Sequence, residues 1–156
     1  MTSGEFNAAP MDTLARVLTA VVIVMAGAFP FIPNMPVYGA LVMPLIILVT
    51  WLFAVRGYAI EDGVLKIQRP FWTTTISLPP DTVFRAEPEI RKGLWRTAGN
   101  GGLFGYTGWY RNSSLGSFRA YVTSWSNAVS ITSESTGLRI VLSPESQGII
   151  LLDTVS

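Results

Sequence analysis

Two long apolar stretches near the N-terminus dominate the pattern of hydrophobic and polar positions along the chain. They cover Leu14–Ile32 and Val37–Val55, and each contains 19 residues. A helix of that length is roughly 28 Å long, which is close to the hydrocarbon thickness of a bilayer. The second stretch has no charged residue, and the first has only Arg16. The pattern therefore predicts two transmembrane helices.

The segment Pro30–Pro36 predicts a tight turn between these stretches, so that the two helices form a hairpin. It contains three prolines, and residues that precede a proline are disfavoured in a helix. A cleavable signal peptide is the alternative explanation for an early apolar stretch. However, the acidic residues Glu5 and Asp12 precede the first cation, and a second apolar stretch follows. The sequence therefore favours retention of both helices.

The few charges that flank the hairpin predict its orientation. The turn carries no charge, whereas Arg16 and Arg56 lie at the opposite end of the two helices. By the positive-inside rule, both termini and the C-terminal domain are expected in the cytoplasm. The expected organisation is a flexible N-terminal tail (residues 1–12), a transmembrane hairpin (residues 13–56) and a cytoplasmic domain (residues 57–156).

From Tyr58 onward, the helical pattern gives way to short strand-like runs separated by turn residues. The dipeptide Asp62-Gly63, which type I′ hairpin turns favour, separates two such runs within residues 58–68. Further strands are expected at residues 71–78, 82–87, 103–111, 116–124, 128–132 and 138–142. This spacing is typical of a small β-barrel or sandwich.

The end of the chain carries the signals of a short C-terminal helix. Ser143, Pro144 and Glu145 match the N-cap, the first position and the acidic first turn of a helix, and the apolar run 149–152 follows. Seven or eight short strands followed by one helix describe a partly open antiparallel β-barrel whose open end the helix covers. The expected fold class is thus an α+β membrane protein.

Four runs in this domain resemble the bacterial pleckstrin-homology-like (PH-like) domain. They are Gly102–Tyr110, Leu115–Thr123, Val129–Ile131 and Ile140–Glu145. The resemblance covers about residues 57–156, and in small membrane proteins of this kind two spans often precede the domain. It implies a PH-like barrel at the bacterial inner membrane, usually with no assigned biochemical activity. The phosphoinositide binding of eukaryotic PH domains does not follow from it.

The composition excludes several classes of chemistry. The chain has no cysteine and no histidine, which removes disulfides, thiol chemistry, histidine-based triads and Cys/His zinc sites. The net charge is +1, so no strong field favours nucleic acid. We therefore expect no enzymatic activity, no cofactor, no metal and no small-molecule substrate.

The glycine-rich segment 99–105 does not match a nucleotide-binding loop. The last glycine of a G-x-G-x-x-G pattern is replaced by Phe104, and no Gly-Lys-Ser/Thr follows. We expect this segment to be a flexible entry to the strand at 103–111.

Aromatic and basic side chains concentrated in the middle of the domain predict a protein-binding surface. Exposed aromatics beside arginines are common anchors of protein interfaces. The candidate partner-binding residues are Trp95, Tyr106, Trp109, Tyr110, Arg111 and Arg119. Core packing is the alternative explanation for part of this cluster.

A second set of basic residues predicts a surface that faces anionic lipid headgroups. These candidates are Arg16, Arg56, Arg85, Arg91, Lys92 and Arg96. Alternation along strands would instead scatter some of these side chains over different faces.

Three functions remain open on the sequence alone. The leading hypothesis is a non-enzymatic protein-interaction or scaffold module at the cytoplasmic membrane surface, which binds another protein or another copy of itself. The alternatives are recognition of anionic lipid headgroups and an accessory role in a larger membrane complex.

Overall fold

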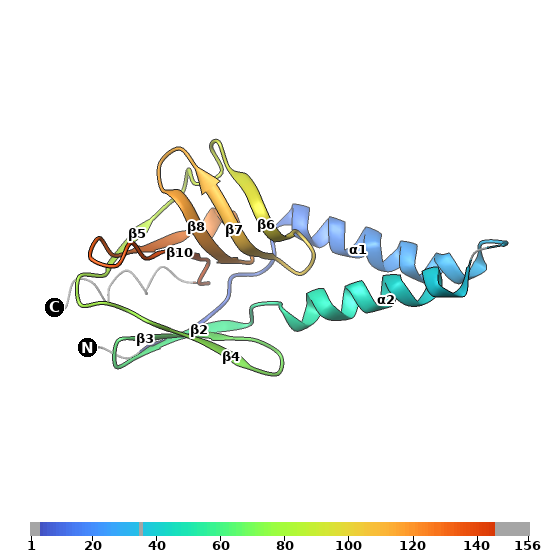
Figure 1. Cartoon of the computed structure of the whole chain (residues 1–156), viewed down its shortest axis with the longest axis horizontal. Coiled ribbons are helices and arrows are strands. Elements are labelled where there is room, and N and C mark those ends of the chain that lie inside the picture. Colours follow the sequence, from blue (N-terminus) through green and yellow to red (C-terminus); the bar gives the residue numbers. More distant parts are fainter. Residues whose placement is uncertain (1–3, 35, 146–156) are drawn as a thin grey trace.

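The computed structural model describes residues 4–34 and 36–145. Two helices, α1 (Thr13–Ala28) and α2 (Val37–Leu52), lie side by side and extend away from a domain built of two β-sheets (Figure 1). A short 3₁₀ helix, η1 (Phe29–Phe31), follows α1 at the end far from the domain. The expected order of an apolar helical region followed by a β-domain is confirmed.

Only the first helical segment has the length of a membrane span among the residues described. Thr13–Phe31, which comprises α1 and η1, has 19 residues, and its mean hydropathy reaches 2.0. α2 is also apolar, but it has 16 residues and ends at Leu52. The helix is shorter than the apolar stretch from which it was predicted, because Val55 already packs in the core of the β-domain.

The β-domain consists of two sheets that form the two layers visible in Figure 1. The smaller sheet has the order β1-β2-β3-β4, with β1 (Gly4–Asn7), β2 (Gly57–Glu61), β3 (Val64–Gln68) and β4 (Thr73–Ser77). The larger sheet has the order β5-β9-β10-β8-β7-β6, with β5 (Val83–Ala86), β6 (Trp95–Gly101), β7 (Tyr106–Asn112), β8 (Gly116–Val122), β9 (Val129–Thr132) and β10 (Arg139–Leu142). A second 3₁₀ helix, η2 (Trp125–Asn127), connects β8 to β9.

The arrangement of the described strands differs from the antiparallel barrel expected from the sequence. The strands form two separate sheets, and β10 runs parallel to β8. β9 and β10 form an antiparallel hairpin, and β10 is the strand of this hairpin that lies next to β8. The domain is a two-layer sandwich with one parallel strand pair at the centre of its larger sheet.

The N-terminal residues, expected to be a flexible tail, instead form an edge strand. β1 pairs antiparallel with β2 over its four residues. The backbone N–H of Ala9 donates to the carbonyl oxygen of Ser143 at 2.8 Å, and the N–H of Glu145 donates to the carbonyl oxygen of Asn7 at 2.8 Å. The sequence gives little signal for this strand, because it is short and has a single large apolar residue, Phe6.

The strands after residue 57 agree with the expected runs except for β6, for which no strand was expected and whose last three residues fall in the glycine-rich segment expected to be flexible. The turn at Asp62-Gly63 is confirmed, with the positive φ angles of 50° and 73° that a type I′ turn requires. β6 was missed because its glycines weaken the strand pattern. One of them has a packing reason: a Cβ at Gly99 would lie 2.4 Å from the carbonyl oxygen of Thr107 on β7.

The six-stranded sheet is packed on both faces. Between the two sheets lies one core, which includes Tyr58, Leu65, Ile67, Ile131 and Leu142. On the opposite face lies a second core, which includes Ala15, Ile90, Tyr110, Phe118 and Trp125. The second core places the first turn of α1 directly against the sheet.

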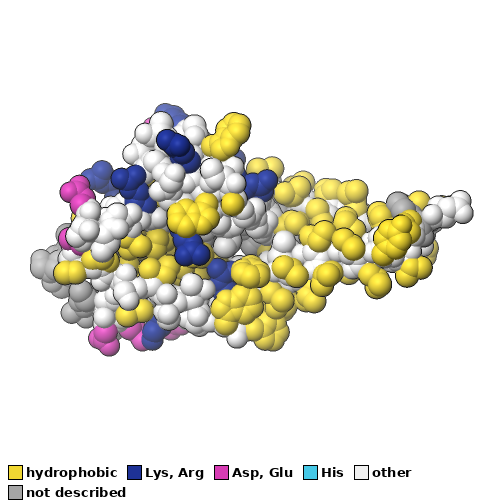
Figure 2. Space-filling view, viewed as in Figure 1, with side chains coloured by type: hydrophobic (Ala, Val, Ile, Leu, Met, Phe, Trp, Pro, Cys, Tyr) yellow, Lys and Arg dark blue, Asp and Glu magenta, His cyan; other side chains and the backbone are white. Residues whose placement is uncertain are grey.

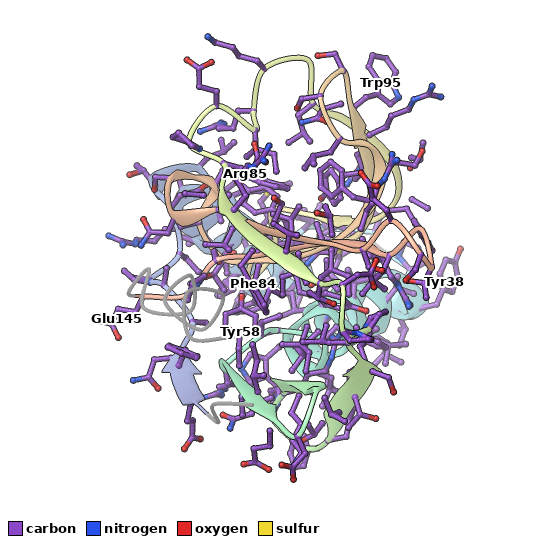
Figure 3. The ribbon with its side chains drawn as sticks, turned by 90° about the vertical axis from the view of Figure 1, so that its left-hand side faces the viewer. Tyr38, Tyr58, Phe84, Arg85, Trp95 and Glu145 are labelled. Carbon is purple, nitrogen blue, oxygen red and sulfur yellow. The ribbon has the colours of Figure 1, made fainter. Side chains whose placement is uncertain are left out.

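Buried hydroxyl groups join the two ends of the chain to the first core. Tyr58 lies between the two sheets (Figure 3) and donates its hydroxyl proton to the carbonyl oxygen of Tyr121 at 2.6 Å. The same hydroxyl accepts the N–H of Ser143 at 3.2 Å, and the Ser143 hydroxyl accepts the N–H of Thr123 at 2.7 Å. Ser143, expected to be the N-cap of a C-terminal helix, is thus part of the core. Pro144, expected at the first position of that helix, instead forms an antiparallel bridge with Ala8, and the rest of the expected helix, from residue 146 on, lies outside the described residues.

Replacement of Tyr58 by Phe is expected to lower the free energy of unfolding by about 1–3 kcal/mol, because the carbonyl of Tyr121 loses its buried donor. Thermal unfolding of the detergent-solubilised chain, followed by near-UV circular dichroism, would measure the change. Tyr38→Phe is the matched control, since Tyr38 is 72% exposed. Equal stability of the two variants would contradict the role of the Tyr58 hydroxyl.

The contribution of Tyr58 is also expected to depend on alkaline pH. Burial raises the pKa of Tyr58 from 10.0 to about 12, against a smaller opposing effect of the hydrogen bonds with Ser143. An unfolded tyrosine ionises at lower pH than the buried one, so this stabilisation is complete below pH 10 and is lost as the pH rises to about 12. Stability measured across this interval should decline less steeply in Tyr58→Phe than in the wild-type chain.

Candidate functional site

One face of the six-stranded sheet is only partly covered by the smaller sheet. On β9 and β10, Ile131 and Ile140 are buried in the core between the sheets. On β7, Trp109 is 50% exposed. The same sheet therefore supplies both a core wall and an open surface.

Four of the six candidate partner-binding residues share this open surface. Trp95 on β6 pairs with Arg111 on β7, and Trp109 on β7 pairs with Arg119 on β8. Side chains two residues apart on a strand point to the same face, so the two pairs lie on one surface. Trp95 is 74% exposed and lies at the outer end of the domain in Figure 3.

The other two candidate residues are core residues, and the prediction that they contact a partner is wrong. Tyr106 and Tyr110 are 5% and 3% exposed and pack in the second core. The ring of Tyr110 lies 5.4 Å from that of Trp125 and 6.3 Å from that of Phe118. These tyrosines alternate with Trp109 and Arg111 along β7, so they point to the opposite face of the sheet.

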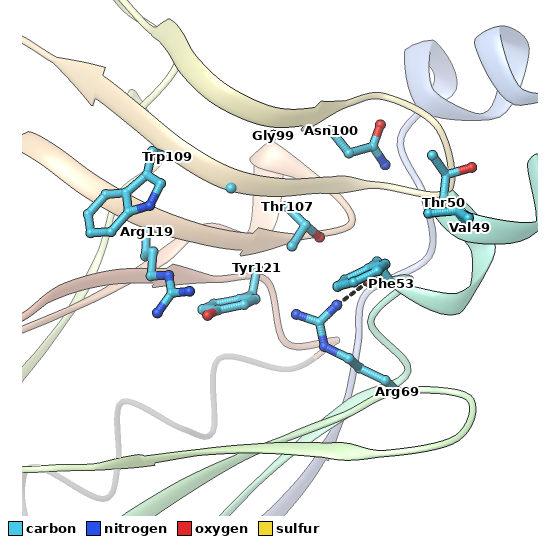
Figure 4. Close-up of a pocket in the computed structure, with 11 residues that line it drawn as sticks. Val49, Thr50, Phe53, Arg69, Gly99, Asn100, Thr107, Trp109, Arg119 and Tyr121 are labelled. Atoms are coloured by element: carbon cyan, nitrogen blue, oxygen red, sulfur yellow. Dashed lines mark hydrogen bonds between the residues drawn. The ribbon is translucent and has the colours of Figure 1, made fainter. Parts of the chain in front are cut away.

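A groove opens where this exposed surface meets the end of α2 (Figure 4). It has a volume of about 350 Å³. α2 contributes Val49 and Thr50, Phe53 follows the helix, and Arg69 reaches in from the segment between β3 and β4. The sheet contributes the remaining lining residues, Gly99, Asn100, Thr107, Gly108, Trp109, Arg119 and Tyr121.

Two arginines and one tyrosine ring form the polar end of the groove. The guanidinium carbons of Arg69 and Arg119 lie 5.5 and 5.9 Å from the centroid of the Tyr121 ring. Arg119 also lies 5.4 Å from the ring of Trp109. Aromatic faces attract cations through their quadrupole, so these rings orient both guanidinium groups.

Arg69 is held in place by hydrogen bonds to uncharged acceptors. Its Nη1 donates to the carbonyl oxygen of Phe53 at 2.6 Å, the contact drawn in Figure 4, and its Nε donates to Thr74 Oγ1 at 3.2 Å. Burial lowers the pKa of Arg69; Tyr121 opposes this change, and the nearby Arg119 adds to it. The guanidinium nevertheless stays protonated at neutral pH.

The groove holds this positive charge without a carboxylate. Among the described residues, no Asp or Glu lines it. Within residues 4–34 and 36–145, the ion pairs are Lys66–Glu61 and Lys92–Glu89, so neither Arg69 nor Arg119 has an acidic partner there. The arrangement is suited to binding an anion. In the same part of the chain, no three Asp or Glu side chains are grouped as a metal site would require.

Aromatic side chains surround the point where α2 enters the domain. The rings of Trp51 and Phe71 are 6.0 Å apart in an edge-to-face arrangement, and those of Phe53 and Trp72 are 5.2 Å apart. Arg56 lies 5.8 Å from the ring of Trp51. Tryptophan and arginine at the end of an apolar helix are typical of a membrane–water interface.

The basic residues proposed to face lipid do not form one surface. Arg85 lies on the outer edge strand β5, in a depression that also contains Asp81 and Glu134. Lys92 pairs with Glu89 at 2.8 Å.

The remaining four of these basic residues lie closer to the helices. Arg91 and Arg96 line a depression beside Leu14 of α1, and Arg16 and Arg56 flank the domain ends of α1 and α2. The basic residues that remain candidates for lipid contact are therefore those near the helix ends.

Hydrogen bonds fix the direction of α1 relative to the sheet. Asp12 caps the helix by accepting the N–H of Ala15 at 2.8 Å, and its carboxylate also accepts the hydroxyl proton of Tyr106 at 3.1 Å. One turn further, Thr19 Oγ1 accepts the N–H of Phe104 at 3.0 Å. Burial, with a further contribution from Asp12, raises the pKa of Tyr106 well above its usual value, so its hydroxyl remains a donor.

Sequence reasoning missed Arg69 and Tyr121 as site residues, although both line the groove. Arg69 lies in the short connection between β3 and β4, where Arg-Pro-Phe-Trp combines cationic and aromatic residues next to a turn signal. That local composition was the available clue. The contact of Arg69 with Tyr121 depends on tertiary structure and has no signature along the chain.

The family described as Bacterial PH domain matches residues 56–152. No curated protein and no solved structure matches the chain.

Aromatic substitutions on the two faces of the larger sheet should differ in their effect on the free energy of unfolding. Tyr110→Ala is expected to lower the free energy of unfolding by about 3–5 kcal/mol, because it leaves a cavity beside Trp125 and Phe118. Trp95→Ala should change it by less than about 0.5 kcal/mol, since that side chain is mostly exposed. Thermal unfolding in detergent would compare the two; a large loss in Trp95→Ala would contradict the assignment of faces.

Proposed function

Because the chain belongs to the bacterial PH domain family, we propose that it is a non-enzymatic interaction module anchored in the cytoplasmic membrane by two helices. The β-domain lies at the cytoplasmic surface and binds another protein, or a second copy of the chain, through the open face of β6–β8. The observation that carries this proposal is the pairing of exposed tryptophans with arginines on that face.

The surface of the two helices supports membrane anchoring. Large apolar side chains are exposed along both, including Val24 at 69%, Val37 at 76% and Leu41 at 68%. A soluble monomer rarely exposes a continuous apolar surface of this kind. α2 is about 24 Å long, shorter than the hydrocarbon core, and a bilayer accommodates such a helix by local thinning.

Strand pairing on either side of the helices supports two crossings rather than one. β1 precedes both helices and β2 follows them, yet the two strands are neighbours in one sheet. A single crossing would place β1 and β2 on opposite sides of the membrane. An even number of crossings keeps them together.

The charge distribution supports a cytoplasmic domain with its helix end at the headgroups. Arg16, Arg56 and Arg69 lie where the helices meet the domain, and cations near the ends of membrane helices favour the cytoplasmic side. On the face shown in Figure 2, acidic side chains gather at the end of the domain away from the helices, while basic side chains are spread over the domain and also occur near the helices. This polarity suits an anionic membrane surface.

The open face of β6–β8 has the composition of a protein interface. Trp95 and Trp109 offer large apolar anchors, and Arg111 and Arg119 offer planar cations beside them. Tryptophan and arginine are enriched among residues that dominate binding energy. Placing this face on a membrane-bound domain confines a partner to the same surface and raises its effective concentration.

Single cysteines would test the topology, because the chain contains none. Ile32→Cys, between the two helices, should react with a membrane-impermeant maleimide in intact spheroplasts. Thr136→Cys, in the exposed connection between β9 and β10, should react only after lysis. The reverse pattern, or equal labelling of both before lysis, would contradict the proposed orientation.

Substitutions at the open face would test partner binding. Trp95→Ala and Arg111→Ala should each weaken a purified complex, and loss of a tryptophan anchor typically raises Kd by about 30-fold. A photo-reactive amino acid at Thr97 on β6 should crosslink to the partner or to a second chain, and particle mass in detergent would distinguish these. Val83→Ala, on the opposite edge strand β5, is the control. Binding that is unchanged in the Trp95 and Arg111 variants would exclude this face.

A further inference from the structure

We propose that the groove between α2 and the open face of the β-domain binds one anionic phospholipid of the surrounding leaflet, with the phosphate between Arg69 and Arg119 and an acyl chain along α2. This inference rests on the proposed membrane anchoring. It differs from a general basic surface because it names a single site, and the site requires both α2 and the β-domain.

Charge complementarity selects an anion for the polar end of the groove. Arg69 and Arg119 face the same aromatic ring, Tyr121, and no carboxylate lines the groove. Two guanidinium groups can donate several hydrogen bonds to phosphate oxygens in the planar geometry that arginine favours. An anion would also relieve the repulsion between the two cations.

The position of the groove selects a membrane lipid as the source of that anion. Val49 and Thr50 of α2 form one wall, and Val49 is 42% exposed on the apolar helix surface. The ring of Trp72 lies 5.2 Å from that of Phe53 and 5.8 Å from the guanidinium of Arg69, where an interfacial aromatic is expected. A molecule bound here would contact the arginines at one end and the apolar helix at the other, as an amphiphile does.

The fixed geometry of Arg69 indicates a preformed site. Its hydrogen bonds to the Phe53 carbonyl and to Thr74 join the end of α2 to β4. These contacts leave its Nη2 without a hydrogen-bond partner in the described part of the chain. Arg119 makes no side-chain hydrogen bond there and is positioned by Trp109 and Tyr121. Binding would therefore require little ordering of the protein.

Native mass spectrometry of the full-length chain would test the proposal after reconstitution in nanodiscs of phosphatidylcholine alone or mixed with phosphatidylglycerol. The wild-type chain should retain one phosphatidylglycerol and no comparable phosphatidylcholine. Arg69→Gln and Arg119→Gln should each reduce the retained anionic lipid about tenfold or more, because each removes charge-assisted hydrogen bonds. Arg85→Gln, which lies on the far edge strand β5, should retain it as the wild type does.

Several results would overturn the proposal. Equal retention in all variants, equal retention of the two lipids, or equal loss in Arg85→Gln would each exclude a specific site. Displacement of the lipid by soluble glycerol 3-phosphate would identify a free phosphate compound as the ligand instead. Arg119→Gln keeps the test valid if Arg69→Gln fails to fold, since Arg119 has no structural hydrogen bond in the described residues.

The two proposals fail in different ways. If the chain extracts from membranes without detergent, anchoring and the lipid site both fail. If the cysteine labels show two crossings but anionic lipid is not selected, only the lipid site fails. Partner binding is measured with Trp95 and Arg111, which do not line the groove.

Discussion

The carboxylate of Asp12 sets the direction in which the helices leave the β-domain. It accepts the N–H of Ala15 at the start of α1 and the hydroxyl proton of Tyr106 on β7. With Thr19 bound to the β6–β7 turn, α1 is attached to the sheet at two points about two helical turns apart. α2 packs on α1. The contacts of Asp12 therefore also determine where the end of α2 and the groove beside it lie.

The two faces of the larger sheet differ in how far their side chains are buried. Toward α1 and η2 its side chains are buried and aromatic, and toward the smaller sheet they are buried only over β8 to β10. The smaller sheet does not cover Trp109 on β7. Trp109 and Arg111 on this uncovered part lie outside both cores, whereas their neighbour along β7, Tyr110, is fixed by packing.

Local sequence patterns predict the apolar helices, most strands, the Asp62-Gly63 turn and the family. They cannot predict the burial of Tyr106 and Tyr110, because both faces of β7 carry aromatic residues and alternation alone does not say which face meets the second core.

β1 and β6 are edge strands with weak apolar patterns, so their pairing is set by neighbours rather than by their own residues. Arg69 and Arg119 are 50 residues apart in the sequence, yet both lie against the ring of Tyr121. Neither local segment could predict this proximity.

β1 and the residues after it pair with β2 and with the segment that follows β10. This arrangement has a consequence for the order in which the protein is synthesised and folded. β1 leaves the ribosome before both helices, but its neighbours include β2, which emerges after both helices, and the backbone at Ser143 and Glu145, which emerges after all the described strands. The parallel pair β8–β10 likewise cannot form before residue 139 is synthesised. In the proposed membrane topology, both helices are therefore synthesised before the domain can be completed, and an N-terminal segment on the opposite side of the bilayer from β2 would leave the smaller sheet without β1.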